Sequence, residues 1–153
     1  MTGIWRVSLD GETPPSLFAA TDDQNLVGDV EGLDIYHGES RSVLLASSQG
    51  DSSYVAYDLA SAEQLAKFAI ASTPDDSIDG TQDTDGIAVS NAAISGHPKG
   101  LLVVQDGFNI DQDQRTLNQN FKLIDWRAIS AVLPLNDFQN QQQSRLLFPA
   151  SCF

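Results

Sequence analysis

The sequence predicts an all-β protein. Short runs of β-branched, aromatic and leucine residues follow one another along the chain, and Gly, Asp, Ser, Asn and Pro separate them. Of the 153 residues, 41% are hydrophobic and 19% are charged, a composition that supplies enough apolar material for the core of one domain. Turn signals recur every several residues, which is typical of a sandwich, a barrel or a propeller.

Eight runs are predicted to be strands. In chain order they are IWRVSL, LDIY, VLLASS, SYVAYDL, AKFAIA, GIAVS, GLLVVQ and FKLIDW. SYVAYDL alternates most clearly, because Tyr54 and Ala56 fall on one face of the strand while Val55 and Tyr57 fall on the other. The strands make roughly two groups of about 40 to 45 residues, the blade spacing of propellers, with further strands at each end.

Two segments have a helical alternative. DLASAEQLAKF reads either as a helix or as two strands joined by a turn. DWRAISAVL places Trp126, Ile129 and Leu133 on a common helical face, so we expect a helix there.

The chain is strongly acidic, with 21 acidic and 8 basic residues and a formal net charge of −13. This charge excludes nucleic-acid binding by surface electrostatics, which needs clustered Lys and Arg, and it favours divalent cations. No apolar run reaches the length of a membrane span, and the first residues lack the pattern of a signal peptide. The one cysteine, Cys152, excludes an internal disulfide.

Four acidic loops, each beside a predicted strand, offer oxygen ligands: GDVEGL, SSQGDSSY, DGTQDTDG and QDGFNIDQDQ. Calcium binds about six to eight oxygens, more than any one of these loops supplies, so a site requires several loops to converge. DGTQDTDG is not an EF-hand, since Thr81 and Ala92 stand where that motif needs Asp and Glu. The alternative is that each loop is a solvated turn, because Asp and Gly are common turn formers.

The order of these loops resembles the C-terminal half of the β-propeller phytases. The matching segments are DVEGLDIY, LLASSQGDSSYVAYD, DGTQDTDGIAV, KGLLVVQDG and NQNFKLIDW. The resemblance as a whole covers about Gly3 to Ile129. The resemblance implies a partial six-bladed β-propeller of about three blades. We therefore expect a partial β-propeller phytase domain over residues 1–133 and an unassigned tail over residues 134–153.

The resemblance also implies an activity, which is 3-phytase-type hydrolysis of phytate (myo-inositol hexakisphosphate) with calcium as the cofactor. The residues that match calcium-ligand or cleft positions are Asp29, Glu31, Gln49, Asp79, Asp85 and Asn109. Of these, Glu31 and Asp85 are the predicted catalytic residues. Members of the family are typically exported, so the resemblance implies a secreted or periplasmic protein.

Two departures from the family pattern bear on whether this chain alone is expected to be active. Phe108 follows QDG where many relatives have Glu, and the N-terminal blades that carry the phosphate-binding lysines and arginine have no counterpart here. We expect the chain to supply the acidic, calcium-binding wall of the cleft and to need a missing N-terminal half for activity. The alternatives are a non-catalytic calcium-binding or interaction module and an incomplete gene product. The expected ligand is phytate, with no nucleic acid and no membrane.

Overall fold

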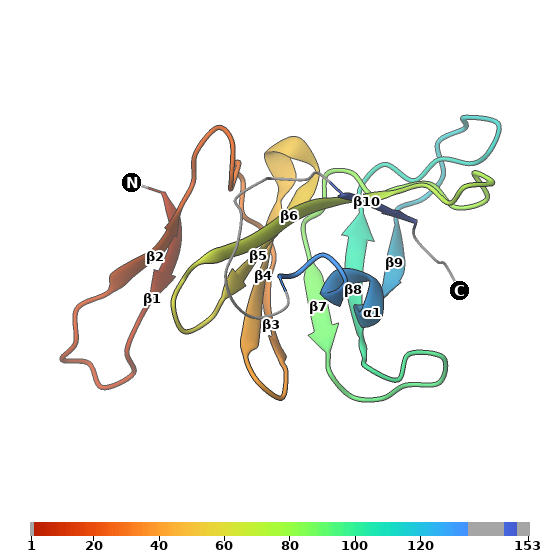
Figure 1. Cartoon of the computed structure of the whole chain (residues 1–153). Helices are drawn as coiled ribbons and strands as arrows, with labels where there is room; N and C mark the ends of the chain where they lie inside the picture. The colour runs from red at the N-terminus through yellow and green to blue at the C-terminus, as the bar shows by residue number, and fades with distance from the viewer. Residues whose placement is uncertain (1, 135–145, 150–153) are drawn as a thin grey trace.

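The fold is a row of three β-sheets, which Figure 1 shows from the N-terminal sheet on the left to the C-terminal sheet on the right. A computed structural model describes residues 2–134 and the backbone of residues 146–149. The predicted all-β class is confirmed, since the described residues form strands, one short α-helix and one 3₁₀ turn. The three separate sheets are consistent with about three blades of a propeller.

Each sheet is built from neighbouring segments of the chain. The first sheet pairs β1 (Gly3–Arg6) with β2 (Ser16–Ala20). The central sheet has the order β10-β6-β5-β4-β3 and contains β3 (Leu33–His37), β4 (Ser42–Ser48), β5 (Ser53–Asp58), β6 (Gln64–Ala71) and β10 (Leu146–Pro149). The third sheet contains β7 (Ile87–Ser90), β8 (Leu101–Asp106) and β9 (Asn120–Asp125). Neighbouring strands are antiparallel, except that β10 runs parallel to β6.

The predicted elements agree with this arrangement at most positions. The eight predicted strands correspond to β1 and to β3 through β9, and DLASAEQLAKF forms the end of β5, a turn and β6. The expected helix is α1 (Trp126–Ser130), which ends before Leu133; Asp125 caps its start by accepting a hydrogen bond from the backbone N–H of Arg127. Strand β2 was not predicted. Pro14 and Pro15 directly precede it, and its sequence SLFAA is too short to show a clear strand pattern. It forms a strand by pairing with β1.

The central sheet is buried on both faces. Alternate residues of β4 and β5 enter two different clusters: Val43, Leu45, Tyr54 and Ala56 pack with the third sheet and α1, whereas Leu44, Ala46, Val55 and Tyr57 pack with the first sheet. The alternation predicted in SYVAYDL is therefore confirmed. Because successive side chains point to opposite faces, this sheet lies between its two neighbours, as a propeller blade does.

The two outer sheets expose apolar side chains. Trp5 and Leu17 are cross-strand partners in the first sheet, and Trp5 is 48% exposed. On β9, Phe121 is 63% exposed. Each outer sheet therefore exposes at least one large aromatic side chain.

Part of the predicted tail lies outside the described residues, namely 135–145 and 150–153, which include Cys152. The boundary predicted at residue 133 stays a prediction. A search of the described helices for a segment long and apolar enough to cross a bilayer found none.

Candidate functional site

The four acidic loops lie at one end of the sheets. Leu33 at the start of β3 pairs with Ala46 near the end of β4, so the loop before β3 and the turn after β4 share that end. Ile87 at the start of β7 pairs with Val104 near the end of β8, which places the loops before β7 and after β8 together. β3 also contacts β7, and Figure 1 shows these loops at the upper edge of the row.

Three of these loops meet in a loop junction, defined by residues 28–32, 47–50 and 85–87. Ser47 accepts hydrogen bonds at Oγ from the backbone N–H groups of Glu31 (3.3 Å) and Gly32 (2.7 Å). The backbone N–H of Gln49 donates to the carbonyl of Asp29 at 3.0 Å, and its side-chain Nε2 donates to Oδ1 of Asp85. Four of the six predicted metal residues are therefore on segments that touch.

Two glycines allow this close approach. A Cβ atom at Gly32 would lie 2.7 Å from the carbonyl oxygen of Asp85 and 2.9 Å from the backbone nitrogen of Ile87. A Cβ atom at Gly50 would lie 2.0 Å from the carbonyl oxygen of Gly28. A larger residue at either position would push the loops apart, because these neighbours are backbone atoms.

The carboxylates at the junction differ in their surroundings. Asp29 and Glu31 are exposed, and within residues 2–134 neither side chain makes a hydrogen bond or an ion pair. Asp85 is also exposed, but it accepts the hydrogen bond from Gln49, and its backbone N–H donates to Oε1 of Gln105 at 2.9 Å. Over the described ranges, no three His, Cys, Asp or Glu side chains converge closely enough to hold a metal ion by themselves.

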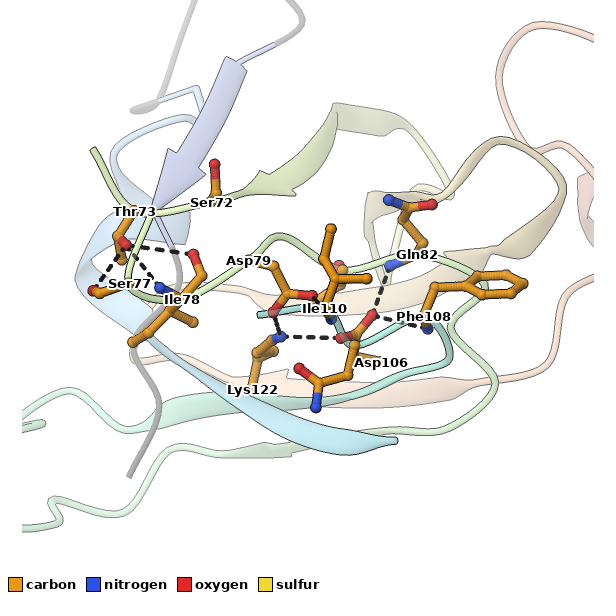
Figure 2. A network of polar contacts seen from close by, with 12 residues as sticks. Ser72, Thr73, Ser77, Ile78, Asp79, Gln82, Asp106, Phe108, Ile110 and Lys122 are labelled. Atoms are coloured by element: carbon orange, nitrogen blue, oxygen red, sulfur yellow. Dashed lines mark hydrogen bonds and ion pairs between the residues drawn. The ribbon is translucent and has the colours of Figure 1, made fainter. Parts of the chain in front are cut away.

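The two remaining predicted ligands lie in a separate place. Figure 2 shows Lys122 between Asp79 and Asp106, and we call these three residues the buried ion triad. The Nζ atom of Lys122 bonds to Oδ1 of Asp79 and lies 3.0 Å from Oδ2 of Asp106. The side chains of Lys122 and Asp106 are 0% exposed, while that of Asp79 is 14% exposed.

The buried ion triad also holds the backbone of two loops. Oδ1 of Asp106 accepts the N–H of Gln82 at 3.0 Å, and Oδ2 of Asp79 accepts the N–H of Ile110 at 2.8 Å. Burial alone would lower the pKa of Lys122, but the hydrogen bonds from its ammonium to the two aspartates outweigh that effect and raise the pKa. Lys122 is therefore charged within the triad.

A hollow of about 400 Å³ opens beside Asp79. Its lining includes Asn109 and Asn120, and Asn109 is held by a 2.6 Å hydrogen bond from its Nδ2 to the carbonyl of Asn118. The Oδ1 atom of Asn120 is buried and has no hydrogen-bond partner in the described structure. The hollow thus presents oxygen atoms of the kind that calcium binds.

Tyr54 holds the loop that connects the hollow beside Asp79 with the loop junction. Its hydroxyl is within 2.8 Å of Thr81 Oγ1 and 2.6 Å of Thr84 Oγ1, and all three residues are buried. Burial raises the pKa of the Tyr54 hydroxyl to about 12, so it stays neutral at physiological pH. These two hydrogen bonds hold the loop that carries Asp79 and Asp85 against strand β5.

The predicted site residues therefore separate into two groups. Asp29, Glu31, Gln49 and Asp85 belong to the loop junction, and Asp79 and Asn109 line the hollow. The prediction missed the three residues that hold these groups in place, which are Ser47, Asp106 and Lys122. Asp106 lies in one of the four acidic loops, whereas nothing in the sequence pattern marks Ser47 or Lys122 as buried.

Three packed sheets with acidic loops gathered at one end define a propeller-like protein with a polar end surface. The sequence profile of the family described as Phytase matches residues 2–148, and the chain therefore belongs to the phytase family. The match continues past Leu133 through most of the tail.

A curated relative agrees with the family match. The chain is 38% identical over 151 residues to a protein named 3-phytase from Bacillus subtilis (strain 168). The alignment covers 94% of this chain but only 38% of the relative. The chain thus spans well under half the length of the relative that it matches.

Proposed function

We propose that this chain forms the acidic, calcium-binding part of a 3-phytase, an enzyme that releases phosphate from phytate. Membership of the phytase family and the similarity to a protein named 3-phytase support the reaction class. The observation that carries the proposal is the convergence of three acidic loops at the loop junction, where the carboxylates of Asp29 and Glu31 face solvent without partners in residues 2–134.

Calcium is the proposed cofactor, because the donor set consists of carboxylate and amide oxygens. Asp29, Glu31, Gln49 and Asp85 would hold calcium at the loop junction, with Gln49 using its side-chain oxygen since Nε2 already donates to Asp85. Asp79 and Asn109 would offer oxygens to a second ion in the hollow. When bound, calcium would neutralise phosphate charge and lower the pKa of a bound water.

The ligand atoms are of the type that calcium binds, but the described residues supply fewer of them than calcium needs. No three metal-binding carboxylates converge among the described residues, whereas calcium needs about six to eight oxygens. Water, substrate phosphate and residues from another segment would complete the coordination. This agrees with a chain that spans 38% of its relative.

Glu31 and Asp85 are the proposed catalytic residues. Both are exposed at the loop junction, and Glu31 has no partner within residues 2–134 that would compete for a proton or a cation. Oδ1 of Asp85 is bonded to Gln49, and Oδ2 makes no hydrogen bond within residues 2–134. Glu31 would accept a proton from the attacking water, while Asp85 would orient the cation that meets the phosphate.

The phosphate-binding cations would come from outside this chain. Lys122 is buried in the triad, and Lys67 forms a 2.6 Å ion pair with Asp51. Arg115, on an acidic loop, is paired with Asp113 at 3.3 Å. We therefore propose that the chain acts with a missing N-terminal segment, which would also cover Trp5 and Leu17, and that the complete enzyme acts in the periplasm or outside the cell.

A non-catalytic calcium-binding module is the second candidate. The pairing of Lys67 with Asp51 and of Arg115 with Asp113 favours it, because these basic side chains are already engaged by carboxylates of this chain. A module would bind calcium as the enzyme does, but it would not release phosphate when the remaining blades are supplied.

The deciding experiment measures phosphate release from phytate with calcium present. We would compare the 153-residue chain with a fusion in which the N-terminal part of the Bacillus subtilis 3-phytase precedes it. We expect little release by the chain alone and clear, calcium-dependent release by the fusion. A folded fusion without activity would favour the non-catalytic module, and full activity of the chain alone would refute the need for a second segment.

A further inference from the structure

Ser47 connects two segments of the loop junction through a single hydroxyl group. It is the penultimate residue of β4 and is 0% exposed. Its Oγ accepts the N–H groups of Gly32 at 2.7 Å and Glu31 at 3.3 Å, and its O–H donates to the carbonyl of Asp85 at 3.4 Å. One buried side chain therefore contacts the backbone of both proposed catalytic residues.

The backbone of Ser47 reinforces this connection. Its N–H donates to the carbonyl of Gly32 at 2.9 Å, so the main chain and the side chain of Ser47 hold the same short segment. Gly32 in turn lies against the backbone of Asp85 and Ile87. Removal of the hydroxyl would leave a buried N–H of Gly32 without its acceptor, in a place that water does not reach.

The carboxylates themselves have few other constraints. Glu31 and Asp29 are exposed, and their side chains make no hydrogen bond within residues 2–134, so their positions depend on the backbone that carries them. Gln49 restrains Asp85 from the other side. The separation between Glu31 and Asp85 therefore depends on the contacts between their backbone segments, and the Ser47 hydroxyl makes a contact with each of the two segments.

We propose that Ser47 is a positioning residue that fixes the segments of Glu31 and Asp85 relative to each other and thereby sets the calcium affinity of the loop junction. This inference rests on the proposed function, because it takes the loop junction to be a calcium site. Ser47 itself does not bind the ion. Residues that orient the ligands of a metal commonly change metal affinity by about 10- to 100-fold when they are substituted.

A purely structural role for Ser47 predicts a different result. A buried serine that only stabilises the fold would lower the thermal midpoint when it is replaced, and calcium affinity in the folded protein would stay the same. Ser53→Ala is a matched control for this case. Ser53 is a buried serine on the neighbouring strand β5, and its hydroxyl bonds to Asp51, which is not among the proposed ligands.

The experiment compares the parent chain, Ser47→Ala and Ser53→Ala at a temperature where all three are folded. Calcium affinity is measured by calorimetric titration, and the thermal midpoint is measured in chelator. Hydrogen exchange at the Gly32 amide is followed in the metal-free proteins. If Ser47→Ala is too unstable to titrate, Ser47→Cys replaces it, since a thiol is a weaker hydrogen-bonding group of similar shape.

We expect Ser47→Ala to bind calcium about tenfold or more weakly than the parent and to exchange the Gly32 amide faster. Ser53→Ala should lose thermal stability and keep the parent affinity. Equal calcium affinity in Ser47→Ala and the parent would overturn the inference and leave the proposed calcium site standing. A parent chain that binds no calcium would overturn both the inference about Ser47 and the proposed calcium site. The exchange rates of the Gly32 amide would then still show whether the Ser47 hydrogen bond exists.

Discussion

Lys122 and Asp106 form an ion pair of 3.0 Å in which neither side chain is exposed to solvent. Asp79 joins the pair from the rim, where its side chain is 14% exposed. Lys122 thus acts as an internal cation between two aspartates from different parts of the chain. Two loops depend on it, because Asp106 holds Gln82 and Asp79 holds Ile110.

Lys122→Met should strongly destabilise the metal-free chain. The substitution leaves two partly or fully buried carboxylates without their cation, and loss of one partner of a buried pair costs about 3–5 kcal/mol. Denaturant unfolding in chelator measures this change. Lys99→Met is the matched control, since Lys99 is exposed and lies 4.0 Å from Glu39; a surface pair contributes about 0–1 kcal/mol. Equal losses in the two variants would contradict the structural role of the triad.

Glu31→Gln should weaken calcium binding and leave the metal-free stability almost unchanged. Glu31 is exposed, and its side chain has no partner in residues 2–134, so the fold does not depend on its charge, whereas the proposed calcium site does. Calorimetric titration gives the affinity, and thermal unfolding in chelator gives the stability. Glu63→Gln removes the same charge from the turn between β5 and β6 and should keep the parent affinity. A Glu31→Gln variant with parent affinity would remove Glu31 from the proposed ligand set.

Gly32→Ala should open the loop junction. The added methyl group would meet the carbonyl oxygen of Asp85 at 2.7 Å, so the segments must separate. We expect a loss of about 1–3 kcal/mol of stability, as for other overpacked sites, together with weaker calcium binding. Gly86→Ala is the control, because nothing lies within 4 Å of a Cβ atom at Gly86. If Gly32→Ala proves as stable as Gly86→Ala and binds calcium equally well, the close approach is not needed.

Stability should fall in acid, in part through Asp51. Burial alone would raise the pKa of Asp51, but hydrogen bonds from Lys67, Ser53 and Ser48 outweigh it and hold the pKa below its usual value. A lowered pKa in the folded state contributes stability that is present above the unfolded pKa of about 4 and is lost as the pH falls through the folded value.

Asp51→Asn should therefore flatten the loss of stability below about pH 4, relative to the parent chain. Thermal unfolding across this pH range, in chelator, measures the effect. Asp23→Asn is the control, since Asp23 is exposed and its side chain makes no hydrogen bond in residues 2–134. A parent-like pH profile in Asp51→Asn would show that Asp51 does not contribute to acid sensitivity.

The strands were predictable because short apolar runs separated by turn residues mark them, and successive side chains of the central strands enter different clusters as expected. SYVAYDL alternates as read from the sequence, and the structure places Tyr54 and Val55 in different clusters. The gathering of the acidic loops at one end follows from antiparallel pairing between strands that are neighbours in sequence. These features depend on local pattern, which a single sequence contains.

The reversed alternation of β9 could not be predicted. In FKLI the apolar Phe121 would be placed in the core and the charged Lys122 in solvent, yet Phe121 is exposed and Lys122 is buried. The reason is long-range, because the ammonium is paired with Asp79, from the loop before β7, and with Asp106, at the end of β8. Ser47 was missed for a similar reason, since its role depends on two loops that meet only in the folded protein.

The central claim is that the acidic end of this chain binds calcium for phytate hydrolysis. Its most direct test is calcium-dependent phosphate release by the fusion with the N-terminal part of the Bacillus subtilis 3-phytase, measured for the parent sequence, Glu31→Gln and Glu63→Gln. We expect release with the parent sequence and with Glu63→Gln, loss of release in chelator, and a fall of about 100-fold or more in Glu31→Gln. Undiminished release by Glu31→Gln, or release that is unchanged in chelator, would contradict the account.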